Sequence, residues 1–394
     1  MLLTTTVRRA ARATIVAVVV LAAAGCGPHP GQQVRDPPAA AAATRTPEAA
    51  ATAATQRPAG VSASPDVYGA DRPGMLSPVV RRFPSRVYVP NSGDGTVEVI
   101  DPATRRVVGQ FTTGRLPQHV VPSWDLRRLW VTNDQSNTLT PIDPATGRPG
   151  PPVPVADPYN LYFTPDGCRA IVGAERLPRR DFRDPHTMRL RHALAVPCRG
   201  VDHLDFTADG RFLLASCEFS GQLLWVDVRR ERVTGVVRLE PGSKPQDVKL
   251  APDGRLFYVA DMRLGGVHLV DAARPRVVGF LPTGAGAHGL YVSRDSRLLY
   301  VSNRGEGSIS VVSFATRRVV TSWRLPGGGS PDMGGISADG RVLWLAGRYD
   351  AEVYAIDTGS GALLARIKVG QGPHGLCVYP QPGRYSLGHT GVFR

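Results

Sequence analysis

Apolar and polar residues alternate along most of the chain in short runs that predict β-strands joined by tight turns. The clearest unit spans residues 245–282. It contains one run that alternates polar and apolar residues, one run that is nearly continuously apolar, and two further runs. Asp253-Gly254 and Gly265-Gly266 lie between these runs, and Asp-Gly and Gly-Gly pairs favour tight turns. The four strands expected in this unit are Gln246–Leu250, Leu256–Ala260, Val267–Asp271 and Arg276–Leu281.

This unit recurs seven times between Arg86 and Arg384. Two copies of its second strand read Leu129-Trp-Val-Thr-Asn133 and Leu299-Tyr-Val-Ser-Asn303. A period of this length, filled with strand signals and without a long helical pattern, predicts a radial array of small sheets. The equivalent ends of the third strands lie 41 to 44 residues apart, at Asp101, Asp143, Asp184, Asp227, Asp271, Ser313 and Asp357.

The count of strands predicts how the array closes. The first copy supplies only the outer three strands of a unit, within residues 87–112, and the carboxy-terminal end leaves one inner strand over, Gly375–Tyr379. Pairing these two ends removes the open sheet edges that would otherwise invite aggregation. The predicted fold is therefore all-β, a seven-bladed β-propeller of four-stranded antiparallel blades closed by its C-terminal inner strand and its N-terminal outer strands.

The amino-terminal residues predict export rather than a folded domain. Residues 1–26 have a basic start, an apolar core and the ending Leu21-Ala-Ala-Ala-Gly25-Cys26, which is typical of a bacterial lipoprotein signal. Lipid on Cys26 would anchor the protein to the outer side of the cell membrane. Residues 27–75, rich in Ala, Pro, Thr and Gly, predict a disordered tether, and residues 76–394 the propeller with its C-terminal tail.

The charge and the cysteines narrow the possible partners. The formal net charge is +14, but the chain has only three lysines and its arginines are scattered over predicted turns. We therefore expect no nucleic-acid partner, although a basic exported protein is attracted weakly to anionic surfaces. Export permits disulfides, and Cys198 and Cys217, which lie in the same repeat, are the expected pair.

The repeat resembles the YVTN-type β-propeller repeat family over residues 86–384. The resemblance lies in the Tyr/Trp-Val-Thr/Ser-Asn strand and in the Ile142-Asp-Pro-Ala-Thr146 turn. The resemblance implies the propeller fold but does not select one activity. Similar propellers include bacterial surface proteins, lactone hydrolases and haem- or quinone-associated oxidoreductase subunits.

Polar side chains recur where each inner strand begins, and a propeller places these positions around one channel mouth. A mouth of this kind favours binding of a ligand, although wet channel mouths also carry polar residues for structural reasons alone. The predicted ligand-binding residues are Gln118, His119, Asn160, Asp202, His203, Gln246, Asp247, His288, Asp332 and His374.

Three functions stay open. The first is a monomeric cell-surface module that binds a protein or a small anionic ligand, with the basic loop Ala174–Arg180 as a contact. The second is a lactonase-like hydrolase or lyase, and its candidate catalytic residues are His203, Asp205, His288 and Lys249. The third is an oxidoreductase propeller linked to metal or haem.

Sequence arguments weigh against a cofactor. No Cys-x-x-Cys-His motif for haem is present. If a metal is bound, His119, His203, His288 and His374 are its natural ligands. They come from non-adjacent blades, however, and we expect a channel mouth too wide for a metal bond length. We therefore predict neither metal nor cofactor. The tail, residues 385–394, has no predicted position.

Overall fold

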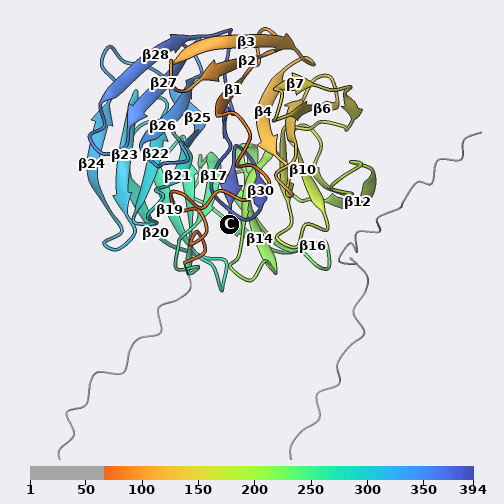
Figure 1. Cartoon of the computed structure of the whole chain (residues 1–394). Helices are drawn as coiled ribbons and strands as arrows, with labels where there is room; N and C mark the ends of the chain where they lie inside the picture. The colour runs from red at the N-terminus through yellow and green to blue at the C-terminus, as the bar shows by residue number, and fades with distance from the viewer. Residues whose placement is uncertain (1–65) are drawn as a thin grey trace, which may run out of the picture. The chain divides into compact units, whose positions relative to one another are not determined.

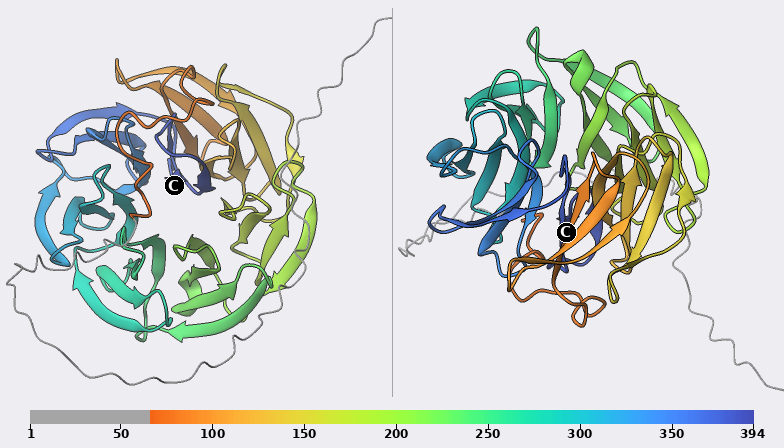
Figure 2. Two further views of the ribbon diagram at one scale, coloured as in Figure 1. Left: turned by 60° about the horizontal axis from the view of Figure 1, so that its bottom comes forward. Right: turned by 90° about the horizontal axis from the view of Figure 1, so that it is seen from above.

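Residues 66–394, the part of the chain that the computed structural model describes, form seven antiparallel sheets set around one axis (Figures 1 and 2). The seven-bladed β-propeller predicted from the repeat is therefore confirmed. The signal segment, Cys26 and residues 27–65 lie outside the described residues. Within residues 66–394, no helix is long and apolar enough to cross a membrane.

The blades are numbered from the first sheet of the chain, with the innermost strand of each first. Blade 1 consists of β29 (Cys377–Tyr379), β1 (Arg86–Asn91), β2 (Thr96–Asp101) and β3 (Arg106–Thr112). Blade 2 consists of β4 (Pro117–Pro122), β5 (Leu129–Asn133), β6 (Thr138–Asp143), β7 (Arg148–Pro149) and β8 (Val153–Pro154). Blade 3 consists of β9 (Asn160–Phe163), β10 (Ala170–Ala174), β11 (Arg179–Arg183) and β12 (Leu190–Ala195). Blade 4 consists of β13 (Val201–Phe206), β14 (Phe212–Cys217), β15 (Gln222–Asp227) and β16 (Arg232–Arg238), with the short helix η1 (Glu218–Ser220) after β14.

The remaining blades are regular. Blade 5 consists of β17 (Pro245–Leu250), β18 (Leu256–Asp261), β19 (Gly266–Asp271) and β20 (Val277–Pro282). Blade 6 consists of β21 (Ala287–Val292), β22 (Leu298–Asn303), β23 (Ser308–Ser313) and β24 (Arg318–Arg324). Blade 7 consists of β25 (Pro331–Ile336), β26 (Val342–Gly347), β27 (Glu352–Asp357) and β28 (Leu363–Lys368). The tail adds β30 (Ser386–Gly388) and β31 (Val392–Phe393) to the inner edge of blade 3.

The ring closes as the strand count predicts. Strand β29 pairs antiparallel with β1, placing Val378 opposite Val87 and Cys377 opposite Tyr88. In Figure 1 the blue C-terminal strands accordingly meet the red and orange N-terminal strands. Closure leaves both faces of β1 covered, so Val87 and Val89 are fully buried.

Hydrophobic layers between neighbouring blades hold the ring together. One cluster joins Ile171 and Phe182 of blade 3 to Phe206 of blade 4, and comparable clusters lie between the other blades. The fourth strand of most blades is largely exposed, as the pattern of β3 and β24 shows. In blade 2 this strand is split into β7 and β8, because the intervening prolines have no N–H to donate to a ladder.

The Thr or Ser of the repeated motif fixes the start of the inner strand. In blades 2, 4, 5, 6 and 7 the register between first and second strands shifts near that start. In blade 2 the hydroxyl of Thr132 accepts the main-chain N–H of His119 at 3.0 Å and donates to the carbonyl of Tyr159 in blade 3 at 3.0 Å. One motif residue therefore positions a channel side chain and ties two blades together.

Both described ends of the chain cover the same face of the ring. Val67 N–H donates to Pro252 O and Tyr68 Oη donates to Leu250 O, both in blade 5. Residues 66–75, which the composition places in the tether, are thus packed on the propeller, because buried Tyr68 supplies the apolar area that the rest of the tether lacks. A bridge between Leu76 and Gly383 joins this segment to the tail.

The tail then enters the channel. Ser386 N–H donates to Trp124 O and His389 N–H donates to Leu161 O, so the chain climbs along the inner edges of blades 2 and 3. Figures 1 and 2 show the C-terminus inside the ring rather than on its rim. His389 and Phe393 are both buried.

Substituting the closing strand tests the ring. Val378→Asp would bury a carboxylate between blades 7 and 1, and we expect it to lower the free energy of unfolding by at least about 3 kcal/mol. Val278→Asp is the matched control, because Val278 lies on the outer strand β20 with 46% of its surface exposed. Urea unfolding followed by tryptophan fluorescence measures both variants. Equal midpoints for the two would show that closure does not stabilise the fold.

Asp71 predicts a pH dependence of stability. Burial raises the pKa of its carboxyl from 3.8 to about 7, although Arg294 and Arg394 oppose this rise. At this group the folded state therefore binds more protons than the unfolded state between about pH 4 and 7, and the contribution of Asp71 to stability falls as pH rises through that window. Buried His119 and His203, whose pKa is lowered, contribute in the opposite direction. Asp71→Asn should remove this fall and stabilise the protein at pH 8 by roughly 1–3 kcal/mol. Denaturant unfolding at pH 4.5 and pH 8 measures it; an Asn variant less stable than the parent at pH 8 contradicts it.

Candidate functional site

Five buried imidazoles meet in the channel. His119, His203 and His288 come from the inner strands β4, β13 and β21, and His374 comes from the segment just before β29. The fifth, His389, comes from the tail. Their ring centroids form a connected set with separations of 4.8 to 6.3 Å. The channel is therefore much narrower at this depth than the ring alone suggests, because the tail fills it.

Three of these rings are close enough to share one ion. His119, His203 and His389 each present one ring nitrogen, and these three nitrogens lie within 4.8 Å of one another. The sequence-based expectation that the channel holds the imidazoles too far apart does not hold for this trio. The expectation was drawn for a ring without its tail, and it is the tail that brings His389 between blades 2 and 4.

His119 is oriented as a ligand would be. Its Nδ1 lies 2.9 Å from the carbonyl oxygen of Tyr159, which can only accept, so Nδ1 carries the proton. The lone pair is then on Nε2, which is buried and has no hydrogen-bond partner. Gly375 makes this position possible, because a Cβ there would lie 2.1 Å from the His119 ring.

Asn160 holds the other two rings of the trio. Its Nδ2 lies 3.2 Å from His203 Nδ1 and 2.9 Å from His389 Nδ1. In both rings Nε2 is buried without a hydrogen-bond partner. Asn160 Oδ1 accepts the main-chain N–H of Leu161 at 2.9 Å, which fixes this orientation of the amide. Its Nδ2 therefore donates to both Nδ1 atoms, and the ring proton of His203 and of His389 is on Nε2.

A carboxylate organises the remaining two imidazoles. Asp332 Oδ1 is 2.9 Å from His288 Nδ1, and Asp332 Oδ2 is 2.7 Å from His374 Nδ1. Arg304 NH1 lies 3.1 Å from Asp332 Oδ1. Burial alone would raise the pKa of Asp332, but His288, Arg304 and His374 outweigh it and hold that pKa well below its usual range. On its other side, His374 Nε2 lies 3.3 Å from the hydroxyl of Tyr159.

Burial favours the neutral form of His119, His203 and His374. It lowers the pKa of His119 and of His203 well below the usual range for histidine, and the neighbouring imidazoles lower both further. Burial, with Arg348 nearby, lowers the pKa of His374 to about 3. Neutral imidazole is the form that binds metal or accepts a proton.

An acidic cluster lies beside the imidazoles, toward the mouth. Glu175 follows β10, Asp202 lies on β13 and Glu218 lies in η1, and one carboxylate oxygen of each falls within 4.8 Å of the others. Burial raises the pKa of Tyr159, and the charges of Asp202, Glu175 and Glu218 raise it further. Since the Tyr159 ring packs 5.2 Å from that of His119, the acidic cluster and the imidazoles are neighbours.

The predicted His–Asp catalytic pairs are arranged differently from the sequence-based hypothesis. Asp205 accepts Arg394 NH2 at 2.8 Å and Leu250 N–H at 2.8 Å, so it ties blade 4 to the tail and to blade 5. Lys249 lines a small cavity of about 40 Å³ beneath the tail, next to Asp71 and Arg294. Within residues 66–394 no hydrogen bond joins His203 to a carboxylate, whereas His288 and His374 share Asp332.

The other predicted binding residues divide between mouth and channel. Gln118 is buried with its Oε1 unpaired, and Gln246 Nε2 lies 3.4 Å from Lys244 O. Asp247 accepts Leu290 N–H and lies 3.7 Å from His389 Nε2. Burial would raise the pKa of Asp247, but Lys249 and His389 outweigh it and lower that pKa.

The basic loop of blade 3 is not a free cationic surface. Arg176 Nε contacts Asp157 at 2.6 Å and its NH2 contacts Asp134 at 3.3 Å. Arg179 pairs with Asp181, and Arg180 is buried. Two of these guanidinium groups are thus paired with carboxylates and the third is buried, so this loop lends no support to recognition of an anionic ligand.

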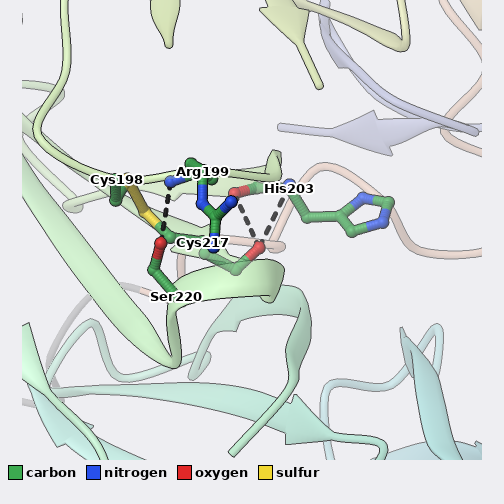
Figure 3. The surroundings of a disulfide bond; sticks show 6 residues. Cys198, Arg199, His203, Cys217 and Ser220 are labelled. Atoms are coloured by element: carbon green, nitrogen blue, oxygen red, sulfur yellow. Dashed lines mark hydrogen bonds between the residues drawn. A yellow bond between two sulfur atoms is a disulfide. The ribbon is translucent and has the colours of Figure 1, made fainter. Parts of the chain in front are cut away.

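A disulfide braces the strand that carries His203. Cys198 and Cys217 are bonded with their Cα atoms 6.1 Å apart, joining the start of β13 to the end of β14 (Figure 3). Ser216, next to Cys217, accepts His203 N–H at 3.1 Å. In Figure 3 the His203 ring points away from the disulfide. The crosslink and the motif serine together set the height of this imidazole in the channel.

Two parts of the site were not among the residues predicted from sequence. His389 lies in a tail outside the repeat, and repeat alignment assigns positions only to residues within it. The grouping of Glu175 with Glu218 depends on two loops of adjacent blades. The sequence signal that could have indicated packing of the tail is its content of glycine and apolar residues. Gly388, for example, lies directly against the main chain of Leu161 and Tyr162, where a side chain would not fit.

The solved structures most similar to this chain share its fold at low sequence identity. Hydrazine synthase from Kuenenia stuttgartiensis matches with TM-score 0.60 and 19% identity, covering 69% of this chain and 92% of that chain. A putative 6-phosphogluconolactonase from Bacteroides uniformis matches with TM-score 0.60 and 17% identity, covering 74% of this chain and 98% of that one. Dihydro-heme d1 dehydrogenase NirN matches with TM-score 0.58 and 16% identity, covering 77% and 76%. Identities this low show the fold alone.

Family models give a firmer assignment. Among curated proteins no match was found. The model of the YNCE-like beta-propeller family, however, matches residues 76–383, which is nearly the whole ring. The chain is therefore a member of the YNCE-like β-propeller family.

Proposed function

We propose that this propeller is a metal-binding protein that holds one divalent transition-metal ion on His119, His203 and His389. The observation that carries the proposal is that three buried imidazoles from two blades and the tail each present one ring nitrogen within 4.8 Å of the other two. Nε2 of His119 and of His203 has no hydrogen-bond partner, and Nε2 of His389 has Asp247 at 3.7 Å. A buried polar nitrogen without a partner costs roughly 1–3 kcal/mol. A bound metal ion would satisfy all three at once.

The donor set suits zinc or copper. Imidazole nitrogens favour Zn²⁺ and Cu²⁺, whereas Ca²⁺ and Mg²⁺ prefer oxygen. Zinc–nitrogen bonds of about 2.0–2.1 Å place tetrahedral ligand atoms about 3.4 Å apart. Because the three nitrogens lie within 4.8 Å of one another, binding would draw any pair together by at most about 1.4 Å.

Contacts outside the trio bear on the same role. Metal-bound histidines usually donate their other N–H to a carbonyl or carboxylate, which fixes the ring. His119 already donates its Nδ1–H to Tyr159 O. Asn160 donates to Nδ1 of His203 and of His389, so binding through Nε2 would require both rings to move their proton to Nδ1 and Asn160 to turn away from Leu161 N–H. Of the three rings, His119 is therefore the one already oriented for a metal ion.

The geometry favours metal binding over the two other functions. Three protein ligands leave a fourth position open, as in catalytic zinc sites, and Tyr159 with His374 and Asp332 could move a proton nearby. The five rings are nearly inaccessible to solvent, however, and the cavity beneath the tail, at about 40 Å³, is too small for a substrate. Haem does not fit, because a porphyrin is wider than the spaces between rings packed 4.8 to 6.3 Å apart.

We propose further that the protein is exported and held at the outer side of the cell membrane by lipid on Cys26. The sequence of residues 1–26 supports this location. Metal binding outside the cytoplasm also agrees with the Cys198–Cys217 disulfide, since disulfides persist in oxidising compartments.

Removing one imidazole of the trio tests the metal centre. Isothermal titration with Zn²⁺ and elemental analysis of the full-length protein should give one tightly bound ion per chain. His203→Ala and His389→Ala should each weaken binding at least about 100-fold, because two imidazoles do not complete the site. Melting curves of both variants will show whether the ring stays folded.

His186→Ala is the matched control, because His186 is an exposed imidazole on a turn of blade 3. It should bind the metal as the parent does. A parent protein that takes up no Zn²⁺ or Cu²⁺, or a His389→Ala variant with unchanged affinity, would overturn the proposal.

Replacing the lipidated residue tests the location. In the native host, the parent should sediment with membranes and Cys26→Ser should appear in the soluble extracytoplasmic fraction, since the variant cannot carry the lipid. Equal membrane association of both proteins counts against anchoring through Cys26.

A further inference from the structure

The acidic cluster of Glu175, Asp202 and Glu218 has no function in the imidazole site. One oxygen of each carboxylate lies within 4.8 Å of the other two. Asp202 is fully buried and neither of its carboxylate oxygens has a hydrogen-bond partner. A buried, unpaired carboxylate facing two others is an unfavourable arrangement unless a positive charge lies between them.

Buried cations of the protein do not meet this need. Arg180 is the nearest buried cation that acts on Asp202, but its three guanidinium nitrogens make no hydrogen bond to the cluster. Arg304, on the other side of the mouth, is paired with Asp332. Burial, together with Glu218 and Glu175, outweighs Arg180 and holds the pKa of Asp202 well above its usual range. Burial and the neighbouring carboxylates also raise the pKa of Glu175 to about 7, so the cluster takes up protons when no other cation is bound.

The cluster is built from rigid parts. Arg176 and Leu177 donate their main-chain N–H groups to Asp157 Oδ2, both at 2.8 Å, and this fixes the loop that carries Glu175. Glu218 N–H donates to Gly200 O at 2.7 Å, and the disulfide at Cys217 holds the start of η1. The three carboxylates are thus held together by elements of blades 3 and 4 and do not meet by chance movement of surface chains.

We infer that Glu175, Asp202 and Glu218 form a second cation site that binds Ca²⁺ near the mouth of the channel. An all-oxygen donor set of carboxylates selects a hard cation, and Ca²⁺ accepts the irregular geometry and additional water ligands that a partly open site offers. Glu175 and Glu218 are partly exposed, so the ion can enter from solvent, whereas Asp202 supplies the buried end of the site. This site uses different residues and different donor atoms from the imidazole centre and does not depend on it.

Calorimetric titration of the full-length protein with Ca²⁺ tests the inference. One site with Kd on the order of 10⁻⁴ M or tighter is expected, together with a rise in melting temperature on adding Ca²⁺. Asp202→Asn keeps the shape of the side chain and removes its charge, and it should weaken Ca²⁺ binding at least about 10-fold. Glu218→Gln, on the partly exposed turn, should do the same if Asp202→Asn proves unstable.

Glu306→Gln is the matched control, because Glu306 is a surface carboxylate on a loop of blade 6 that pairs with Arg324. It should bind Ca²⁺ as the parent does. Glu218→Gln should keep its affinity for Zn²⁺, whereas His389→Ala should keep its affinity for Ca²⁺, so that the failure of either site is seen separately. No saturable Ca²⁺ binding up to about 10⁻³ M, or equal affinity in parent and Asp202→Asn, would mean that protons alone hold the carboxylates together, and the inference would be wrong.

Discussion

In three of the seven blades, one hydrogen bond from a motif hydroxyl sets the depth of the channel side chains. In blades 2, 4 and 6 the motif hydroxyl of Thr132, Ser216 or Ser302 accepts a main-chain N–H at the start of the inner strand. In blades 2 and 6 the same hydroxyl donates to a carbonyl of the next blade. This double use explains why a Thr or Ser recurs in a strand that is otherwise apolar, since a buried hydroxyl is tolerated only with its partners. The imidazoles of blades 2 and 4 depend on it directly.

The tail converts a ring into a site. A seven-bladed ring by itself leaves its inner residues around an open channel. Without the tail, residues 117–119 and 201–203 would line such a channel. Residues 385–394 fill that channel, and Arg394 and His389 contact Asp205 and Asn160 from inside it. Burial in the filled channel also favours the neutral form of His119 and of His203, because desolvation is the largest cause of their lowered pKa. Filling of the channel by the tail thus bears both on the position of the imidazoles and on their burial.

The buried carboxylates of the channel differ in whether a cation or an imidazole pairs with them. The carboxylate of Asp332 is satisfied by His288, His374 and Arg304, whereas Asp202 has no such partners. The nitrogen-rich trio and the oxygen-rich cluster lie on either side of Tyr159. The two proposed sites differ in the hardness of their donor atoms and are made of separate residues.

The repeat determined the fold, and residues within the repeat determined where polar side chains gather. Periodicity requires only that each unit resemble the next, so Asp101 to Asp357 could be aligned and the pairing of β29 with β1 foreseen from the strand count. Which of the channel residues meet was decided by tertiary structure. His389 has no repeat equivalent, and the meeting of Glu175 with Glu218 depends on how adjacent blades set two loops. Alternation of polar and apolar residues predicts which face of its sheet a residue occupies. Contacts across a channel depend instead on the packing of elements that are distant in sequence.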